Sequence, residues 1–217
     1  MYLETERANL RAYNLNPDPK NPTLIWTGTT SDGHDAIVKD NRLYDFAARI
    51  ATNIYDVTNP ASPRLEGSIS RPALIAYHHS GWPSENGDFL FICHEITNKG
   101  DPDLTVWDIR DPGNPKLVTE YDDKDTNVHN LYIIGNFAYT SYYNSGFRIF
   151  DVSDPANIVV VDEFDTSPDV DTGRLFQGAF GVYPFAPSGN IYVTDVTDGL
   201  FIFSFNSGQT STNIVAP

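Results

Sequence analysis

Three histidines occupy equivalent places in the sequence and could together bind a metal ion. His34 and His129 each lie 21 residues before the aromatic residue of a recurring motif, and His79 lies 28 residues before another. The longer interval contains an insertion, "GWPSENGD". The aromatic residues are Tyr55, Phe150 and Trp107. Three imidazoles with an open coordination position would suit zinc, copper or iron.

A second interpretation of these histidines is structural. A histidine that recurs at one place in a repeat can hydrogen-bond the neighbouring unit and bind nothing else. Asp35 and Asn130 directly follow two of the histidines, so on a strand they would point to the opposite side. We expect Asp35 and Asn130 either to hydrogen-bond side chains that ligate the metal or to contact the neighbouring repeat unit. Both interpretations of the histidines stay open at this point.

Two acidic loops raise the separate prospect of calcium. Asp123, Asp125 and Asn127 have the alternate spacing that begins an EF-hand loop, and Asp169 and Asp171 repeat part of it. No glycine follows at the sixth position, and the twelfth is an isoleucine instead of a bidentate glutamate. Solvated acidic loops are therefore the competing interpretation.

The run Cys93-His94-Glu95 ends a predicted strand and is not expected to bind a metal as a block. Side chains alternate along a strand, so Cys93 and Glu95 would share one face and His94 the other.

The histidines must be positioned by a repeated unit, because one motif occurs four times. It reads "LRAYNLNPDP" (10–19), "TNIYDVTNP" (52–60), "LTVWDIRDP" (104–112) and "FRIFDVSDP" (147–155), with a weaker fifth copy around Phe203. Intervals of 42, 52, 43 and 53 residues between the aromatic positions match a four-stranded propeller blade with insertions. No window shows helical periodicity. The sequence therefore predicts an all-β fold, a β-propeller of four-stranded antiparallel blades.

Each blade can be divided into four short strands. In the best example they cover 129–135, 137–143, 147–153 and 158–164. The third strand is apolar on both faces because neighbouring blades would cover it, and it must end at the Asp-Pro turn. Turn residues at 40–41, 87–88, 135–136 and 189–190 would join the first and second strands. The first strand of a blade lines the propeller axis, so the three histidines should converge near one mouth of it.

The composition excludes some partners. With 29 acidic and 14 basic residues, the net charge of −15 repels nucleic acids and anionic membrane surfaces. No stretch of about 20 apolar residues predicts membrane insertion. The single cysteine excludes an internal disulfide framework, and the first residues show no export-signal pattern.

The motifs resemble those of the LVIVD-repeat β-propellers, and more closely the C-terminal portion of the choice-of-anchor B family of bacterial surface proteins. The matching segments are "HD" (34–35), "HSGW" (79–82), "HNLY" (129–132), "YYNSGFRIFDVSDP" (142–155) and "VYPFAPSGNIYVTDVTDGLFIF" (182–203). The resemblance implies an extracellular or cell-surface location. It also implies a longer ring than this chain could form.

We therefore expect one propeller domain, 1–217, that forms a partial ring of about four blades of a larger propeller. The expected blades are 1–30 (partial), 31–71, 72–123, 124–168 and 169–207, followed by a tail, 208–217. They would hold two, four, four, four and three strands, seventeen in all. N-terminal blades from elsewhere or another protein chain would complete the ring. A closed small propeller with one surplus strand is the alternative.

Two functions follow from this sequence. The first is a binding or interaction module with a carbohydrate or a surface protein as its partner. A purely structural spacer in a larger surface protein is hard to separate from this first function. The second is a metal-dependent enzyme with His34, His79 and His129 around the axis. No cofactor other than a divalent metal (zinc, copper, iron or calcium) is indicated, and no catalytic residue can be assigned.

Overall fold

The chain is built from β-strands throughout the residues that the structure, a computed structural model, describes: 2–3, 8–70, 74–97, 101–123, 126–169 and 176–207. The strands form five antiparallel sheets in chain order. Sheet 1 contains β1 (Tyr2–Leu3), β2 (Arg11–Asn14) and β3 (Thr23–Thr27); sheet 2 contains β4 (Asp35–Lys39), β5 (Arg42–Ala47), β6 (Ala51–Asp56) and β7 (Arg64–Ile69); sheet 3 contains β8 (Ser80–Pro83), β9 (Phe89–Cys93), β10 (Leu104–Asp108) and β11 (Lys116–Tyr121); sheet 4 contains β12 (Leu131–Ile134), β13 (Phe137–Ser141), β14 (Phe147–Asp151) and β15 (Val159–Phe164); sheet 5 contains β16 (Ala179–Tyr183), β17 (Asn190–Asp195) and β18 (Gly199–Ser204).

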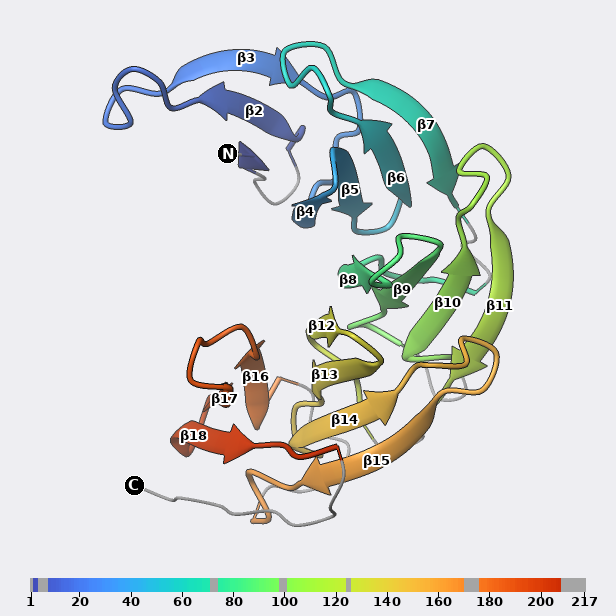
Figure 1. Cartoon of the computed structure of the whole chain (residues 1–217), viewed down its shortest axis with the longest axis vertical. Coiled ribbons are helices and arrows are strands. Elements are labelled where there is room, and N and C mark those ends of the chain that lie inside the picture. The colour runs from blue at the N-terminus through green and yellow to red at the C-terminus, as the bar shows by residue number, and fades with distance from the viewer. Residues whose placement is uncertain are drawn as a thin grey trace.

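The five sheets stand next to one another in an arc, as the blades of a propeller do (Figure 1). In sheets 2 to 5 the first strand lies innermost, and β4 contacts β8, β8 contacts β12, and β12 contacts β16. Sheets 1 and 5 form the two ends of the arc, which is open between them (Figure 1). The predicted all-β propeller of four-stranded antiparallel blades is confirmed.

The strand count differs from the prediction at one place. Sheet 1 has three strands, because β1 pairs with β2 through Tyr2 opposite Ala12 and Leu3 opposite Arg11. The described residues thus contain eighteen strands, one more than the predicted seventeen. A strand of two residues is too short to show the alternation by which strands are recognised in a sequence.

Turn chemistry explains where the strands end. Positive φ angles occur at all four predicted turns between first and second strands, at Asp40, Asn41, Gly87, Gly135 and Gly189. Such angles match the twist of tight β-hairpins. After the third strand of sheet 4, Oδ1 of Asp154 accepts a hydrogen bond from the backbone N–H of Ala156 at 3.0 Å. The Asp-Pro motif is therefore a self-bonded turn that stops the strand, as predicted.

The hydrophobic core fills the interfaces between neighbouring sheets. Between sheets 2 and 3, for example, Tyr44 and Phe46 pack against Ile92 and Trp107, and all four are buried. Similar clusters lie between sheets 3 and 4, 4 and 5, and 1 and 2. At the ends of the arc large apolar side chains stay exposed, among them Leu24 of sheet 1 and Leu200 of sheet 5. The stability of each sheet therefore depends on its neighbours.

Replacing Gly67 by alanine is expected to destabilise the protein by about 3 kcal/mol, since overpacking a tight contact typically costs this much. Gly67 lies in β7, and a Cβ atom there would lie 1.6 Å from the carbonyl oxygen of Pro112 in the Asp-Pro turn of sheet 3. Urea denaturation would measure the change. Gly113→Ala is the matched control, because its Cβ would come no closer than 3.5 Å to any atom. Equal stability of the two variants would contradict this account.

Candidate metal centre

The three histidines lie in a row at one end of the inner strands. Each stands at or just before the start of an inner strand: His34 before β4, His79 before β8 and His129 before β12. The ring centroids of His34 and His79 are 4.4 Å apart, and those of His79 and His129 are 4.6 Å apart. His79 and His129 are buried, and His34 is half-buried. Three sheets thus bring their equivalent imidazoles side by side, as the common spacing predicts.

A carboxylate that the sequence analysis did not select completes the cluster. Glu95 lies just after β9, at the same end of sheet 3 as His79. Its Oε2 is 3.5 Å from Nε2 of His79, and its Oε1 is 3.7 Å from Nε2 of His129. One ligand atom each from His34, His79 and Glu95 lie within 4.8 Å of one another. Two zinc–ligand bonds of about 2.0–2.2 Å span at most about 4.4 Å, so zinc binding would draw these side chains closer together.

The orientation of His129 is fixed by the backbone. Its Nδ1 lies 2.6 Å from the carbonyl oxygen of Phe180. A carbonyl oxygen can only accept, so Nδ1 carries the hydrogen and the neutral ring has its lone pair at Nε2. That lone pair belongs to the nitrogen nearest Glu95. A hydrogen bond from the other ring nitrogen to a carbonyl is the usual support of a histidine that ligates a metal.

His79 and His129 are neutral at neutral pH. Burial is the main cause that lowers the pKa of His79 to about 2, and the neighbouring His129 and His34 contribute to the same shift. Burial likewise lowers the pKa of His129 to about 4. Nε2 of His129 therefore has no hydrogen to donate to the carboxylate oxygen of Glu95 that it faces. Two acceptors in contact repel each other, and a cation between them would remove the repulsion.

A second layer of side chains holds Glu95 in place. The Tyr143 hydroxyl donates a hydrogen bond to Oε1 of Glu95. Nδ2 of Asn127 donates to the carbonyl oxygen of Glu95 at 2.5 Å, and Thr97 donates to Oδ1 of Asn127 at 2.7 Å. Tyr143 has a φ of 34°, which is unusual for a residue with a side chain. Strain of this kind is maintained mainly at functional sites, where surrounding contacts hold it.

Within the described residues, neither Asp35 nor Asn130, which were expected to support the histidines, forms a hydrogen bond with an imidazole. Asp35 uses Oδ1 to accept the backbone N–H of Ala36 at 2.7 Å. Oδ1 of Asn130 is buried and has no hydrogen-bond partner in the described part of the chain. Tyr77, whose hydroxyl lies 3.0 Å from Nδ1 of His34, has the supporting role in their place. Side chains from neighbouring loops, and not from the same strand, reach the imidazoles.

The first calcium loop is occupied by other contacts. Asp123 forms an ion pair with Arg148, and the amide of Asn127 binds Glu95 and Thr97. Asp125 lies outside the described residues. In the second loop Asp169 is exposed, and Asp171 also lies outside the described residues. In the described part of this loop, one carboxylate oxygen of Asp123 and the side-chain amide of Asn127 are thus used in contacts within the protein.

The repeated motif matches one known family. The family described as the LVIVD repeat matches residues 86–123 and 126–166. These segments contain three strands of sheet 3, β9 to β11, and all four strands of sheet 4. The chain is therefore a β-propeller protein that carries LVIVD repeats. The curated proteins include no significant match.

Solved structures are similar in fold alone. The chain resembles a protein from Lactobacillus plantarum (12% identity, TM-score 0.74), a functionally unknown protein from Desulfotomaculum acetoxidans (16%, 0.72) and a periplasmic gluconolactonase from Pseudomonas aeruginosa (12%, 0.72). Each alignment covers 99% of this chain, and 66%, 65% and 66% of the respective solved chains. The chain thus spans just under two thirds of the length of these proteins.

Proposed function

We propose that this chain binds a divalent transition metal ion through His34, His79 and Glu95, with His129 beside them. The observation that carries the proposal is the buried Glu95 carboxylate held between two imidazoles that burial keeps neutral. Two histidines and one carboxylate are the ligand set of many zinc hydrolases and of non-haem iron enzymes. Calcium prefers oxygen ligands alone, so zinc, copper or iron fits better.

The proposed setting is an extracellular or cell-surface propeller of the choice-of-anchor B kind that acts as a binding module. The LVIVD repeats and the motifs around the three histidines support it. In the described part of the chain there is no helix that could span a membrane. The exposed apolar side chains at both ends of the arc fit a ring completed by further blades, from a longer chain or another one.

A metal-dependent hydrolase is the second candidate, and His129 favours it. Three protein ligands leave coordination positions open, and a metal there would act as a Lewis acid. His129 is neutral and lies next to the ligand Glu95. It is therefore suited to accept a proton from an attacking water molecule.

Metal analysis of the purified chain tests the proposal. After treatment with a chelator, the protein would be dialysed against Zn²⁺ and its bound metal measured by atomic emission. We expect one ion per chain, and less than about a tenth of that for His79→Ala. His78→Gln is the matched control, since Nδ1 of His78 bonds Thr52 at 2.8 Å, outside the cluster. No bound ion in the wild-type protein, or equal loss in both variants, would refute a metal centre.

Tyr143→Phe is expected to weaken zinc binding by about ten- to a hundredfold, the usual effect of removing a supporting hydrogen bond to a ligand. The variant keeps the ring, which packs against His129 and Phe176. Competition with a coloured chelator would measure the affinity, and circular dichroism would check the fold. Unchanged affinity would show that the hydroxyl does not position Glu95.

A further inference from the structure

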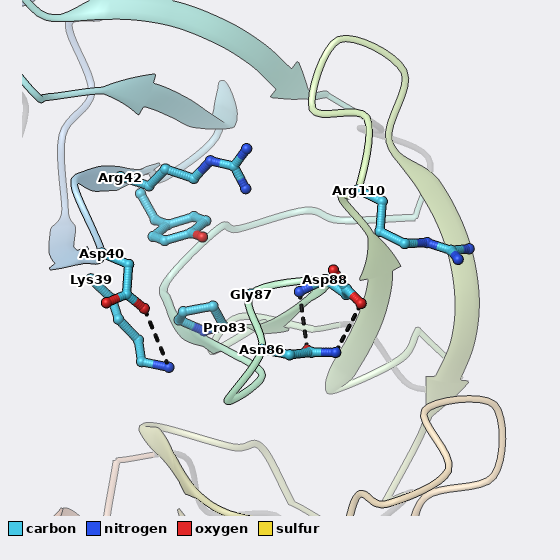
Figure 2. Close-up of a pocket in the computed structure, with 9 residues that line it drawn as sticks. Lys39, Asp40, Arg42, Pro83, Asn86, Gly87, Asp88 and Arg110 are labelled. Atoms are coloured by element: carbon cyan, nitrogen blue, oxygen red, sulfur yellow. Dashed lines mark hydrogen bonds and ion pairs between the residues drawn. The ribbon is translucent and has the colours of Figure 1, made fainter.

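A polar hollow lies at the end of sheets 2 and 3 opposite the histidine cluster. It has a volume of about 270 Å³, near the lower limit for small-molecule pockets. It lies between the β4–β5 turn and the β8–β9 turn (Figure 2). The residues that line it are Lys39, Asp40, Arg42, Tyr44, Pro83, Asn86, Gly87, Asp88 and Arg110. Three of the fourteen basic residues of this acidic chain gather here.

Hydrogen bonds between the sheets fix the walls of the hollow. The Lys39 ammonium donates to the carbonyl oxygens of Ser84 and Glu85 at 3.3 and 3.1 Å, which ties sheet 2 to the turn of sheet 3. On the other wall, Nδ2 of Asn86 donates to Oδ2 of Asp88 at 2.8 Å (Figure 2). A ligand would therefore meet a largely pre-formed site and would not have to order it.

One wall of the hollow offers hydrogen-bond donors. Arg42 uses Nε to bind Glu66 at 3.1 Å, and the rest of its guanidinium lies next to the Tyr44 hydroxyl. Tyr44 is buried, and burial raises the pKa of its hydroxyl, so the group stays protonated. Arg110 differs, because its guanidinium is bound to Asp108 and turned away from the hollow (Figure 2). The Lys39 ammonium is taken up by the two carbonyl oxygens and by ion pairs with Asp40 and Glu85. Arg42 is thus the cation available to a ligand.

The opposite wall offers acceptors. Asp88 comes from the β8–β9 turn and presents carboxylate oxygens. The amide oxygen of Asn86 already accepts hydrogen bonds from the Ser84 hydroxyl and from the backbone N–H of Asp88. Asp40 adds an exposed carboxylate at the β4–β5 turn. Hydroxyl groups of a ligand are the natural partners of such oxygens, while an anionic group would be repelled by them. A ligand with an acidic end and a hydroxylated end matches both walls.

We propose that this hollow binds a small hydroxylated carboxylic acid, such as a uronic acid. Its carboxylate lies against Arg42, and its hydroxyls donate to Asp88 and Asp40. Arginine and carboxylate form strong charge-assisted hydrogen bonds, so Arg42 supplies the selectivity for an acid over a neutral sugar. The site does not depend on the metal centre, because the two lie at opposite ends of the sheets.

Ligand-observed NMR on the whole chain tests the proposal with two ligands, D-glucuronate and D-glucose. Glucose differs only in having a hydroxymethyl group in place of the carboxylate. We expect glucuronate to bind and glucose to bind at least about tenfold more weakly. Arg42→Ala should weaken glucuronate binding by about ten- to a hundredfold. Arg11→Ala is the matched control, because Arg11 is an exposed arginine of sheet 1 that does not line the hollow.

Several outcomes would overturn the assignment. They are equal binding of the two sugars, no binding of glucuronate, or equal affinities of Arg42→Ala and the control. Inorganic phosphate bound as tightly as glucuronate would also overturn it, since phosphate makes no use of the acceptor wall. Asp88→Asn keeps the test decisive if Arg42→Ala does not fold. This variant should weaken glucuronate binding while leaving Arg42 in place.

Discussion

Glu95→Gln is expected to abolish tight metal binding and at the same time to stabilise the metal-free protein. A structural zinc site with four ligands contributes about 10–16 kcal/mol, so each ligand is worth roughly 3 kcal/mol, or more than a hundredfold in affinity. Without metal, an ionised Glu95 would be a buried charge beside imidazoles that carry none. Removing its charge should raise the free energy of unfolding of the metal-free protein by roughly 1–3 kcal/mol.

The opposite signs of these two effects separate a metal centre from a structural cluster. If Glu95 only held neighbouring side chains together, glutamine would destabilise the protein with or without metal. Chelator competition gives the affinity, and urea denaturation in the presence of a chelator gives the stability. Glu85→Gln is the control, because the exposed side chain of Glu85 forms a surface ion pair with Lys39 at 3.8 Å, away from the cluster. Loss of stability in the metal-free Glu95→Gln protein would contradict the assignment.

The metal-free protein should lose roughly 5 kcal/mol or more of stability between pH 7 and pH 4.5. Burial lowers the pKa of His78 and of His94 to about 3, as it lowers those of His79 and His129. The unfolded chain takes up these protons at its ordinary pKa of 6.5, whereas the folded protein does not. The buried neutral histidines therefore make their full contribution to the free energy of unfolding above pH 6.5. This contribution falls as the pH decreases, by roughly 2–3 kcal/mol per histidine at pH 4.5.

Asp103 opposes this loss in part. Burial raises the pKa of its carboxyl to about 8, so the folded protein holds a proton that the unfolded chain releases above its ordinary pKa of 3.8. Its contribution therefore grows as the pH falls from 8 towards 4, by about 3 kcal/mol between pH 7 and pH 4.5. Asp103→Asn should consequently show a steeper acid loss than the wild-type protein. Urea denaturation with a chelator at both pH values measures this, and a flat profile would contradict the buried neutral histidines.

The fold could be predicted because repetition multiplies weak local signals. A single Asp-Pro turn occurs in many folds, but four copies at blade spacing, each after an apolar strand, specify a propeller. The buried Ile149 and Phe150 of β14 show the two-sided burial that the pattern predicts. The strand β1 was missed because two residues carry no periodicity.

The candidate site could be predicted only where it follows the repeat. The histidines recur at one place in successive blades, so their position around the axis follows from the repeat. Glu95 was missed because strand alternation was applied past Cys93, where β9 ends and the loop turns the carboxylate towards His79. Tyr143 and Tyr77 reach the cluster from loops whose paths depend on tertiary contacts, such as the 2.8 Å bond from the Ala179 N–H to the Tyr143 carbonyl. The informative signal was a carboxylate at the end of the strand next to that of His79.

The cluster draws on sheets 2, 3 and 4, and this has a consequence for how the molecule comes apart. In stacked repeats each unit is stabilised mainly by its immediate neighbours, so melting can begin at either end and spread inwards one unit at a time. An ion coordinated by His34, His79 and Glu95 would cross-link sheets 2 and 3, and the contact of His129 with Glu95 would add sheet 4 to this cross-linked pair. Heating the loaded protein would then release the outer units first and leave a central block that melts separately.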